Sequence, residues 1–174
     1  MKPSLLQLRH YKLELLNIEP SSKFASDSED VYPDFEHADF VASIGFGKRA
    51  DEENETDFAV RLELSCSPAV GKIFPYSFSI AALGFVSLAR TEGLNNDPAK
   101  LAAVNGLGLL YGAMRELMLL ITGRFENGPI MLPSVNFIDA GEEVVMQYEK
   151  DKEAAELDRK IRPKKKLSRK KSRN

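Results

Sequence analysis

The sequence predicts an α+β fold in which a four-stranded antiparallel sheet is followed by two helices on one side of it. Three observations predict this order. Segments that alternate apolar and polar residues, as half-buried strands do, fill the first half of the chain. An Asp-Pro pair at residues 97–98 then opens a segment whose apolar residues recur every three or four positions, as in a helix. A last helical segment ends near Pro163, because proline cannot continue a helix.

The four expected strands are separated by turn-forming or charged residues. They cover about residues 7–15, 39–49, 58–65 and 73–88. The third alternates most regularly, with Phe58, Val60, Leu62 and Leu64 on one face. A polar connector, residues 21–37, precedes the second strand, and the acidic run 51–55 is expected to be a solvated turn. We expect consecutive strands to pair as an antiparallel meander.

The first helix is expected over residues 98–122, with Gly123 at its end. Gly106, Gly108 and Gly112 cluster within it, although each glycine costs about 1 kcal/mol relative to alanine in a helix. Such a cluster indicates that another backbone packs closely, for example that of a second copy in a dimer or tetramer. Polar residues interrupt the apolar stretch 101–121, which favours a buried or oligomer-forming helix over a membrane span.

The connection from Arg124 to Pro133 is unusual because it is rich in apolar residues, whereas loops are normally polar. A second helix then begins either after Pro133 or after Asp139 and runs toward Arg162. An apolar loop beside a sheet predicts a groove that binds other polypeptides, because exposed apolar patches usually mark interaction sites.

The net charge of −2 conceals a strong asymmetry. Residues 159–174 contain ten Lys or Arg and no acidic residue, whereas residues 1–158 contain 14 basic and all 26 acidic residues. We therefore expect one acidic domain, residues 1–158, and a disordered basic tail, residues 159–174. The single cysteine, Cys66, fits a reducing compartment, and the first residues lack the apolar core of a signal peptide. Together these features predict a cytoplasmic protein.

The residues do not form a recognisable catalytic or metal-binding pattern. His10 and His37 have no second histidine or cysteine at metal-ligand spacing, and Cys66 is expected to be an inert, half-buried thiol. Gly45-Phe46-Gly47-Lys48 lacks the spacing of a phosphate-binding loop, and no helix is expected after it. We therefore expect a protein that is not an enzyme and that uses no metal or cofactor.

Several short motifs resemble the SecB family of protein-export chaperones over about residues 5–140. Arg115-Glu116 resembles the Arg-Glu pair of the family's first helix, and Val135-Asn136-Phe137 resembles the start of its second helix. Arg124, Ile130 and Leu132 fall where the family has Arg, Leu and Leu. The chain departs from the family in having Ser134 where the family has proline, and in ending with a basic rather than a short acidic tail.

This resemblance implies a chaperone that holds unfolded polypeptides in apolar grooves without ATP and keeps them fit for translocation or free of aggregation. The expected client-binding residues are Phe40, Phe46, Phe125, Ile130, Met131, Leu132, Val135 and Phe137, although Phe40, Phe46 and Phe137 also fit plain core positions. The expected contacts within a homotetramer, a dimer of dimers, are Gly108, Tyr111, Gly112, Arg115 and Glu116. Glu14 and Glu19 are the candidates for docking the SecA motor.

Two other functions fit the same residues. Looser relatives of the family serve toxin–antitoxin modules, which would make an antitoxin the partner. The basic tail also fits a nucleic-acid-binding or ribosome-associated adaptor, because clustered Lys and Arg neutralise phosphates independently of sequence. An acidic domain would repel a polyanion, and the tail has no aromatic residues for base stacking.

Overall fold

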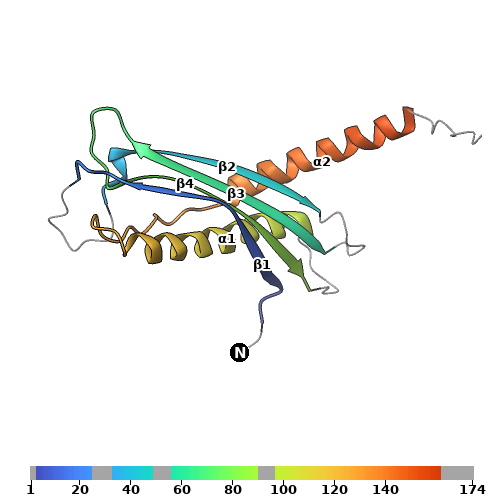
Figure 1. Ribbon diagram of the computed structural model, residues 1–174. Coiled ribbons are helices and arrows are strands. Elements are labelled where there is room, and N and C mark those ends of the chain that lie inside the picture. Colours follow the sequence, from blue (N-terminus) through green and yellow to red (C-terminus); the bar gives the residue numbers. More distant parts are fainter. Residues whose placement is uncertain (1–2, 25–32, 49–55, 90–96, 162–174) are drawn as a thin grey trace, which may run out of the picture.

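A computed structural model of the 174-residue chain describes residues 3–24, 33–48, 56–89 and 97–161. Its elements follow the predicted order and confirm the α+β class, with a four-stranded antiparallel sheet and then two helices. Figure 1 shows the sheet stacked on α1, and α2 running out beyond the sheet. The elements are β1 (Leu6–Pro20), a short 3₁₀ helix η1 (Phe35–His37), β2 (Ala38–Lys48), β3 (Asp57–Pro68), β4 (Tyr76–Leu88), α1 (Pro98–Thr122) and α2 (Ile138–Ile161).

The strand order is β1-β4-β3-β2, so the predicted meander is wrong at its first link. β1 pairs with β4, placing Leu16 opposite Ile80, whereas β2 pairs only with β3. The reason is the length of the connection. Seventeen residues separate β1 from β2, and at about 3.3 Å per residue they easily cross a sheet whose strands lie about 4.8 Å apart. The shorter links from β2 to β3 and from β3 to β4 keep those strands adjacent.

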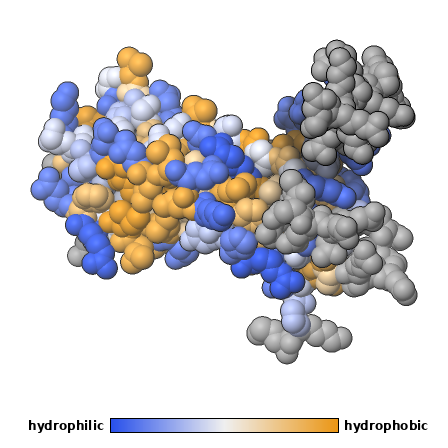
Figure 2. Space-filling view, turned by 45° about the vertical axis from the view of Figure 1, so that its right-hand side comes forward, coloured by the Kyte–Doolittle hydropathy of each residue, from blue (hydrophilic) through white to orange (hydrophobic). Residues whose placement is uncertain are grey.

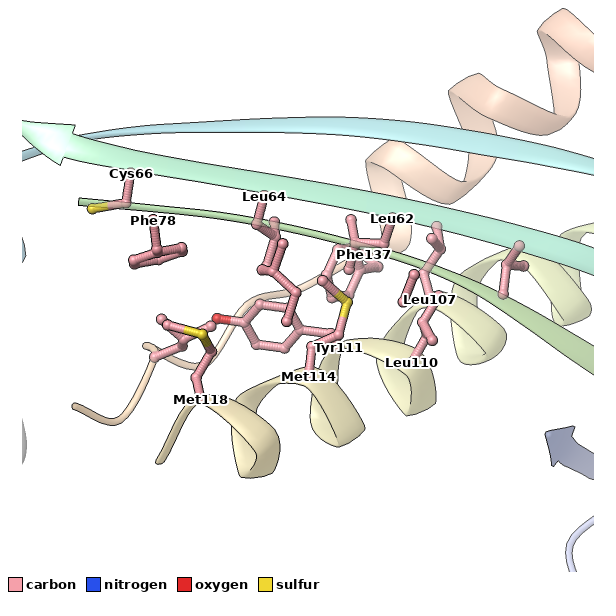
Figure 3. Close-up of a cluster of buried hydrophobic side chains, with 14 of the residues drawn as sticks. Leu62, Leu64, Cys66, Phe78, Leu107, Leu110, Tyr111, Met114, Met118 and Phe137 are labelled. Atoms are coloured by element: carbon pink, nitrogen blue, oxygen red, sulfur yellow. The ribbon is translucent and has the colours of Figure 1, made fainter. Parts of the chain in front are cut away.

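The hydrophobic core lies between the sheet and α1, as Figure 3 shows. Alternate residues of β3 and β4 point toward the helix, and α1 meets them with a stripe spaced by three or four residues. The α1 stripe consists of Leu107, Leu110, Met114 and Met118, all fully buried. Gly106 belongs to the same stripe. A Cβ at this position would come within 3.2 Å of Val60 and Val86, so the close approach of the sheet favours glycine there. The sheet therefore explains one of the three clustered glycines.

Local signals fix both helix starts. The Asp97 carboxylate accepts a hydrogen bond from the Ala99 N–H at 2.9 Å, and Pro98 follows it, as the sequence predicted. The Asn136 side chain accepts from the Ile138 N–H at 3.0 Å, so α2 begins between the two predicted starting points. By length and composition α1 is apolar enough to cross a membrane, but its buried stripe packs on the sheet as a core helix does.

Several expectations fall on residues that the structure does not describe. The acidic turn at 51–55 is one of them, and the basic tail from residue 162 onward is another. The second helix is described up to Ile161, close to the end that Pro163 predicted.

Candidate functional site

An open groove of about 800 Å³ lies between the start of β1, the first half of α1 and the loop that enters α2. Most of its lining is apolar. Leu5, Leu109, Val135 and Ile138 line it with 39–49% of their surface exposed, so the groove can receive further apolar side chains. The other lining residues are Ser4, Leu6, Leu101, Val104, Asn105, Gly108, Asn136 and Phe137.

Hydrogen bonds from buried side chains hold the connection between the helices in place. The Thr122 hydroxyl accepts from the Ile130 N–H at 2.9 Å, and the Tyr111 hydroxyl donates to the Pro133 carbonyl at 2.5 Å. Burial raises the pKa of Tyr111 to about 12, although the nearby Arg115 charge acts in the opposite direction. The ring of Phe137 packs edge-on against Tyr111, with 5.5 Å between centroids. The loop is thus fixed to α1, and this leaves Val135 and Ile138 at the surface.

The expectation that the whole loop presents its apolar residues is wrong for Ile130 and Leu132. Both side chains have no exposed surface and belong to the core between α1 and the sheet. Phe137, at 7% exposed, is also a core residue, the alternative that the sequence had left open. The physical reason is that α1 leaves apolar space beneath the sheet, which these loop side chains fill. Met131 is half-buried and interacts with neighbouring residues of the chain.

The remaining predicted client-binding residues lie apart from the groove. Phe125 is exposed beside Tyr76, at a ring distance of 6.0 Å. Phe40, also exposed, packs against Phe35 and Phe78. Only Val135 and Phe137 of the predicted set line the groove.

Phe46 is likewise outside the groove, since it is half-buried between Phe58 and Tyr148 of α2. Its position shows that α2 covers the same face of the sheet as α1, because Phe46 lies opposite the core residue Val60.

Sequence reasoning missed most of the groove. Leu5, Leu109 and Ile138 were not among the predicted residues, because none of them belongs to the apolar loop or to the Val135-Asn136-Phe137 motif. A signal for Leu109 was present in the sequence, since it falls off the stripe of residues 107, 110, 114 and 118 that faces the sheet. An apolar side chain on the solvent face of a helix needs another partner.

A second apolar surface, which we call the α1–β1 face, consists of Tyr11, Leu13, Leu16 and Leu120. All four are exposed, and the pairing register turns the three β1 side chains toward the helix side of the sheet. Figure 2 shows the molecule from a side on which hydrophobic side chains gather into one broad patch. β1 is an edge strand, and its residues 9–17 are all exposed.

The predicted oligomer contacts divide between surface and core. A Cβ on Gly108 or Gly112 would meet nothing within 4 Å, so the backbone of α1 is open there to another chain. Glu116 is exposed and Arg115 half-buried. Tyr111 is not available for such a contact, because it is 5% exposed and its hydroxyl binds Pro133.

The face of the sheet opposite the helices carries charged residues beside exposed apolar ones such as Leu15 and Val41. Arg61 of β3 bridges two carboxylates there, Glu14 at 2.7 Å and Glu63 at 2.9 Å, and these hydrogen bonds, that to Glu14 first, raise the pKa of Arg61. Glu19 accepts a hydrogen bond from Asn17 at 3.1 Å. Glu14 is therefore already engaged within the chain, while Glu19 lies exposed at the end of β1.

The three residues considered for catalysis or metal binding, Cys66, His10 and His37, lie apart from one another. Cys66 is buried in the core, and burial, with a smaller effect of Asp39, raises the pKa of its thiol to about 12. His10 stacks on Phe85, and His37 lies 3.5 Å from Asp34. Within residues 3–24, 33–48, 56–89 and 97–161, no group of three or more His, Cys, Asp or Glu side chains could hold a metal ion.

No protein-family model matches the chain, and no curated protein matches it. Among solved structures it is similar to the Mycobacterium tuberculosis SecB-like chaperone Rv1957, solved in complex with a ChAD peptide from the Rv1956 HigA1 antitoxin. The identity is 19%, the TM-score 0.48, and the match covers 75% of this chain and 88% of the other. It is also similar to a Streptococcus agalactiae protein of unknown function, at 10% identity and a TM-score of 0.42, covering 74% of this chain and 97% of the other. These likenesses concern the path of the chain, and neither protein's activity follows from them.

Proposed function

We propose that this protein is a SecB-like holding chaperone that binds apolar segments of unfolded polypeptides without catalysis and without ATP. The observation that carries the proposal is the open groove, whose apolar side chains are half-exposed although the chain has an ordinary, fully packed core. Concave apolar sites of this size usually bind something. The resemblance of Val135-Asn136-Phe137 and Arg115-Glu116 to SecB motifs gives the kind of ligand.

The energetics suit a binder of varied sequences. Each fully buried Val, Leu or Ile of a client contributes about 1.5–3 kcal/mol, so a few side chains in the groove give useful affinity. Backbone pairing along an edge strand adds to this without reading the sequence, and the edge strand β1 begins at Leu6, beside the groove. The formal charge of −12 on residues 1–158 keeps such an apolar protein soluble.

The α1–β1 face supports assembly of several copies. Its exposed Leu120 lies on the same helix as Gly108 and Gly112, where a second backbone can approach closely. A lone chain would leave this face in water at a cost of about 25 cal/mol per Å² of apolar surface. Self-association covers it, and the SecB resemblance suggests a dimer of dimers.

The partner to which the client is passed differs between the two candidate roles, protein export and a toxin–antitoxin module. Translocation precursors handed to SecA would make Glu19 the better docking residue, since Glu14 is bound by Arg61. In a toxin–antitoxin setting the client would be an apolar segment of an antitoxin. Both settings use the same groove, and both fit a cytoplasmic protein.

The test is suppression of aggregation when a chemically denatured protein is diluted into buffer containing the native assembly, followed by light scattering. The variant V135S/I138S removes two half-exposed groove side chains and leaves the buried loop residues in place. It is expected to lose most of the protection.

A matched control is V70S/L157S, which replaces two exposed aliphatic residues outside the groove. It is expected to protect like the parent. Equal protection by the groove variant and the parent, with both chains folded, would mean that the groove does not hold clients.

A further inference from the structure

We propose that Asn105 and Asn136 bind the main chain of an extended polypeptide segment in the groove. This inference rests on the proposed holding function and names the form in which the groove takes its ligand. Both asparagine side chains line the groove, and both are exposed. Among the described residues no charged side chain lines it, so an occupant meets these two amides and the Ser4 hydroxyl as the polar side-chain groups.

Asn105 offers a hydrogen-bond acceptor. Its Nδ2 atom donates to the Leu101 carbonyl, one turn earlier in α1, at 3.0 Å. Because a carbonyl oxygen can only accept, this bond fixes which end of the side-chain amide is the nitrogen. The Oδ1 atom at the other end makes no hydrogen bond within the described residues. It is therefore left to accept a hydrogen bond from a ligand.

Asn136 offers the opposite group. Its Oδ1 atom accepts from the Ile138 N–H at 3.0 Å and so holds the start of α2. A backbone N–H can only donate, so the other end of this amide is the side-chain nitrogen. In the part of the chain that the structure describes, that nitrogen has no hydrogen-bond partner. Two different elements, α1 and the loop that enters α2, thus present one acceptor and one donor to the same groove.

Each amide is set among apolar side chains. Leu101 and Leu109 lie one turn before and one turn after Asn105 on α1, and both line the groove. Val135, which is half-exposed, directly precedes Asn136. A ligand that covers these apolar side chains also excludes water from the amides, and a hydrogen bond is stronger where water is excluded. The groove therefore combines apolar anchoring with two directed polar contacts.

An extended polypeptide is the ligand whose polarity fits this pair. The negative partial charge on Asn105 Oδ1 and the positive one on Asn136 Nδ2 complement the N–H and C=O groups of a peptide unit. An extended segment has these groups free, whereas a helix bonds them internally and a lipid chain has none. A helix or a lipid would thus bury both amides unpaired, which is unfavourable. Main-chain binding also leaves the client's sequence unread, as varied unfolded clients require.

The probes are a fluorescent heptapeptide of alternating leucine and serine and its ester analogue, in which the three central amide links are esters. The analogue keeps every side chain, but it lacks those N–H donors and has weaker carbonyl acceptors. Fluorescence anisotropy with the full-length protein measures both affinities. The parent is expected to bind the peptide about tenfold more tightly than the analogue, because each hydrogen bond is worth about fivefold in affinity. Equal affinities for the two probes would overturn the inference.

The variant N105L distinguishes main-chain binding from apolar contact alone. It removes the acceptor and enlarges the apolar surface of the groove. Apolar contact alone predicts tighter binding of the peptide, which would overturn the inference, whereas a lost acceptor predicts binding about fivefold weaker. The double variant N105L/N136D also removes the donor, while aspartate keeps an acceptor for the Ile138 N–H. It is expected to bind the two probes equally, to within about twofold.

The matched control N17L/Q147E makes the same kinds of change at two exposed amides outside the groove. It should keep the parent's preference for the peptide, and loss of that preference would overturn the inference. Circular dichroism of all variants should match the parent, since every replaced side chain is exposed. Absence of peptide binding by the parent would overturn the proposed function as well. Tight binding of both probes alike, abolished by V135S/I138S, would overturn the inference alone and leave the holding function standing.

Discussion

Gly141, in the first turn of α2, lies directly on Val104 of α1. A Cβ added to residue 141 would come within 2.6 Å of the Val104 Cγ2 atom and 3.0 Å of its Cα, closer than real side chains pack. The same crossing carries an ion pair between Lys100 and Glu142 at 2.6 Å, with both side chains about half-exposed. Exposed pairs are worth at most about 1 kcal/mol, so close backbone packing rather than charge sets the angle at which α2 leaves α1.

Replacing Gly141 by alanine is therefore expected to destabilise the protein. Alanine improves intrinsic helix propensity by about 1 kcal/mol, but overpacking against a neighbouring backbone costs about 1–3 kcal/mol. The net loss should appear in the free energy of unfolding measured by denaturant titration. A substitution in the same turn, E143A, replaces an exposed residue and should change stability by less than about 0.5 kcal/mol. Greater stability of G141A than of the parent would contradict the close packing.

The hydroxyl of Tyr111 provides a second test, because it ties the loop to α1 through the Pro133 carbonyl. Removing it in Y111F leaves that carbonyl without its partner and should cost about 1–2 kcal/mol at neutral pH. The control is Y11F, which changes an exposed tyrosine on β1 and should leave stability unchanged.

The raised pKa of Tyr111 predicts the direction in which the stability of the protein changes at alkaline pH. Burial raises the pKa of Tyr111 to about 12, above the value of about 10 for an exposed tyrosine. The folded state therefore keeps the proton more tightly, and the stability gained below pH 10 is lost as the pH rises from 10 to 12. Y111F should show a smaller loss over that range than the parent does. Parallel alkaline curves for the two proteins would contradict the raised pKa.

Cys66 is expected to react slowly with thiol reagents in the folded protein. Its side chain is 4% exposed, and its pKa of about 12 leaves it protonated at pH 8, whereas the thiolate is the reactive form. In guanidinium chloride the same thiol should react at the rate of a free cysteine, which serves as the internal control. Equally fast labelling before and after denaturation would show that Cys66 is reachable in the folded state.

Periodicity predicted β3, β4 and α1 because each of them buries a single face. The alternation of Phe58 through Leu64 and the cap at Asp97-Pro98 are local signals, and the structure has β3 and α1 where they indicate. The strand order depended on where a long connector leads, which local patterns do not encode. β1 therefore pairs with β4 rather than β2.

The candidate site was harder to predict because apolarity alone does not distinguish filling a core from lining a groove. Ile130 and Leu132 fill the space beneath the sheet, whereas Val135, from the same stretch of chain, lines the groove. Serines at 130–132 would thus test folding rather than binding, since emptying a buried aliphatic position costs about 2–5 kcal/mol. Leu5 and Leu109 also line the groove, and only the folding of the chain brings them close to that stretch.

The proposed self-association predicts how a substitution of Leu120, which lies on the α1–β1 face, changes the native mass. Leu120 is 62% exposed within its own chain, so L120D should leave the fold of a single chain intact. If a second copy covers this residue, an unpaired carboxylate buried at the contact costs several kcal/mol, and the native mass measured by light scattering should fall. L157D changes a leucine of similar exposure, 60%, on the projecting half of α2 and should leave the mass unchanged. Circular dichroism of both variants should match the parent. A native mass unaltered in L120D, with the fold preserved, would place the contact between copies elsewhere.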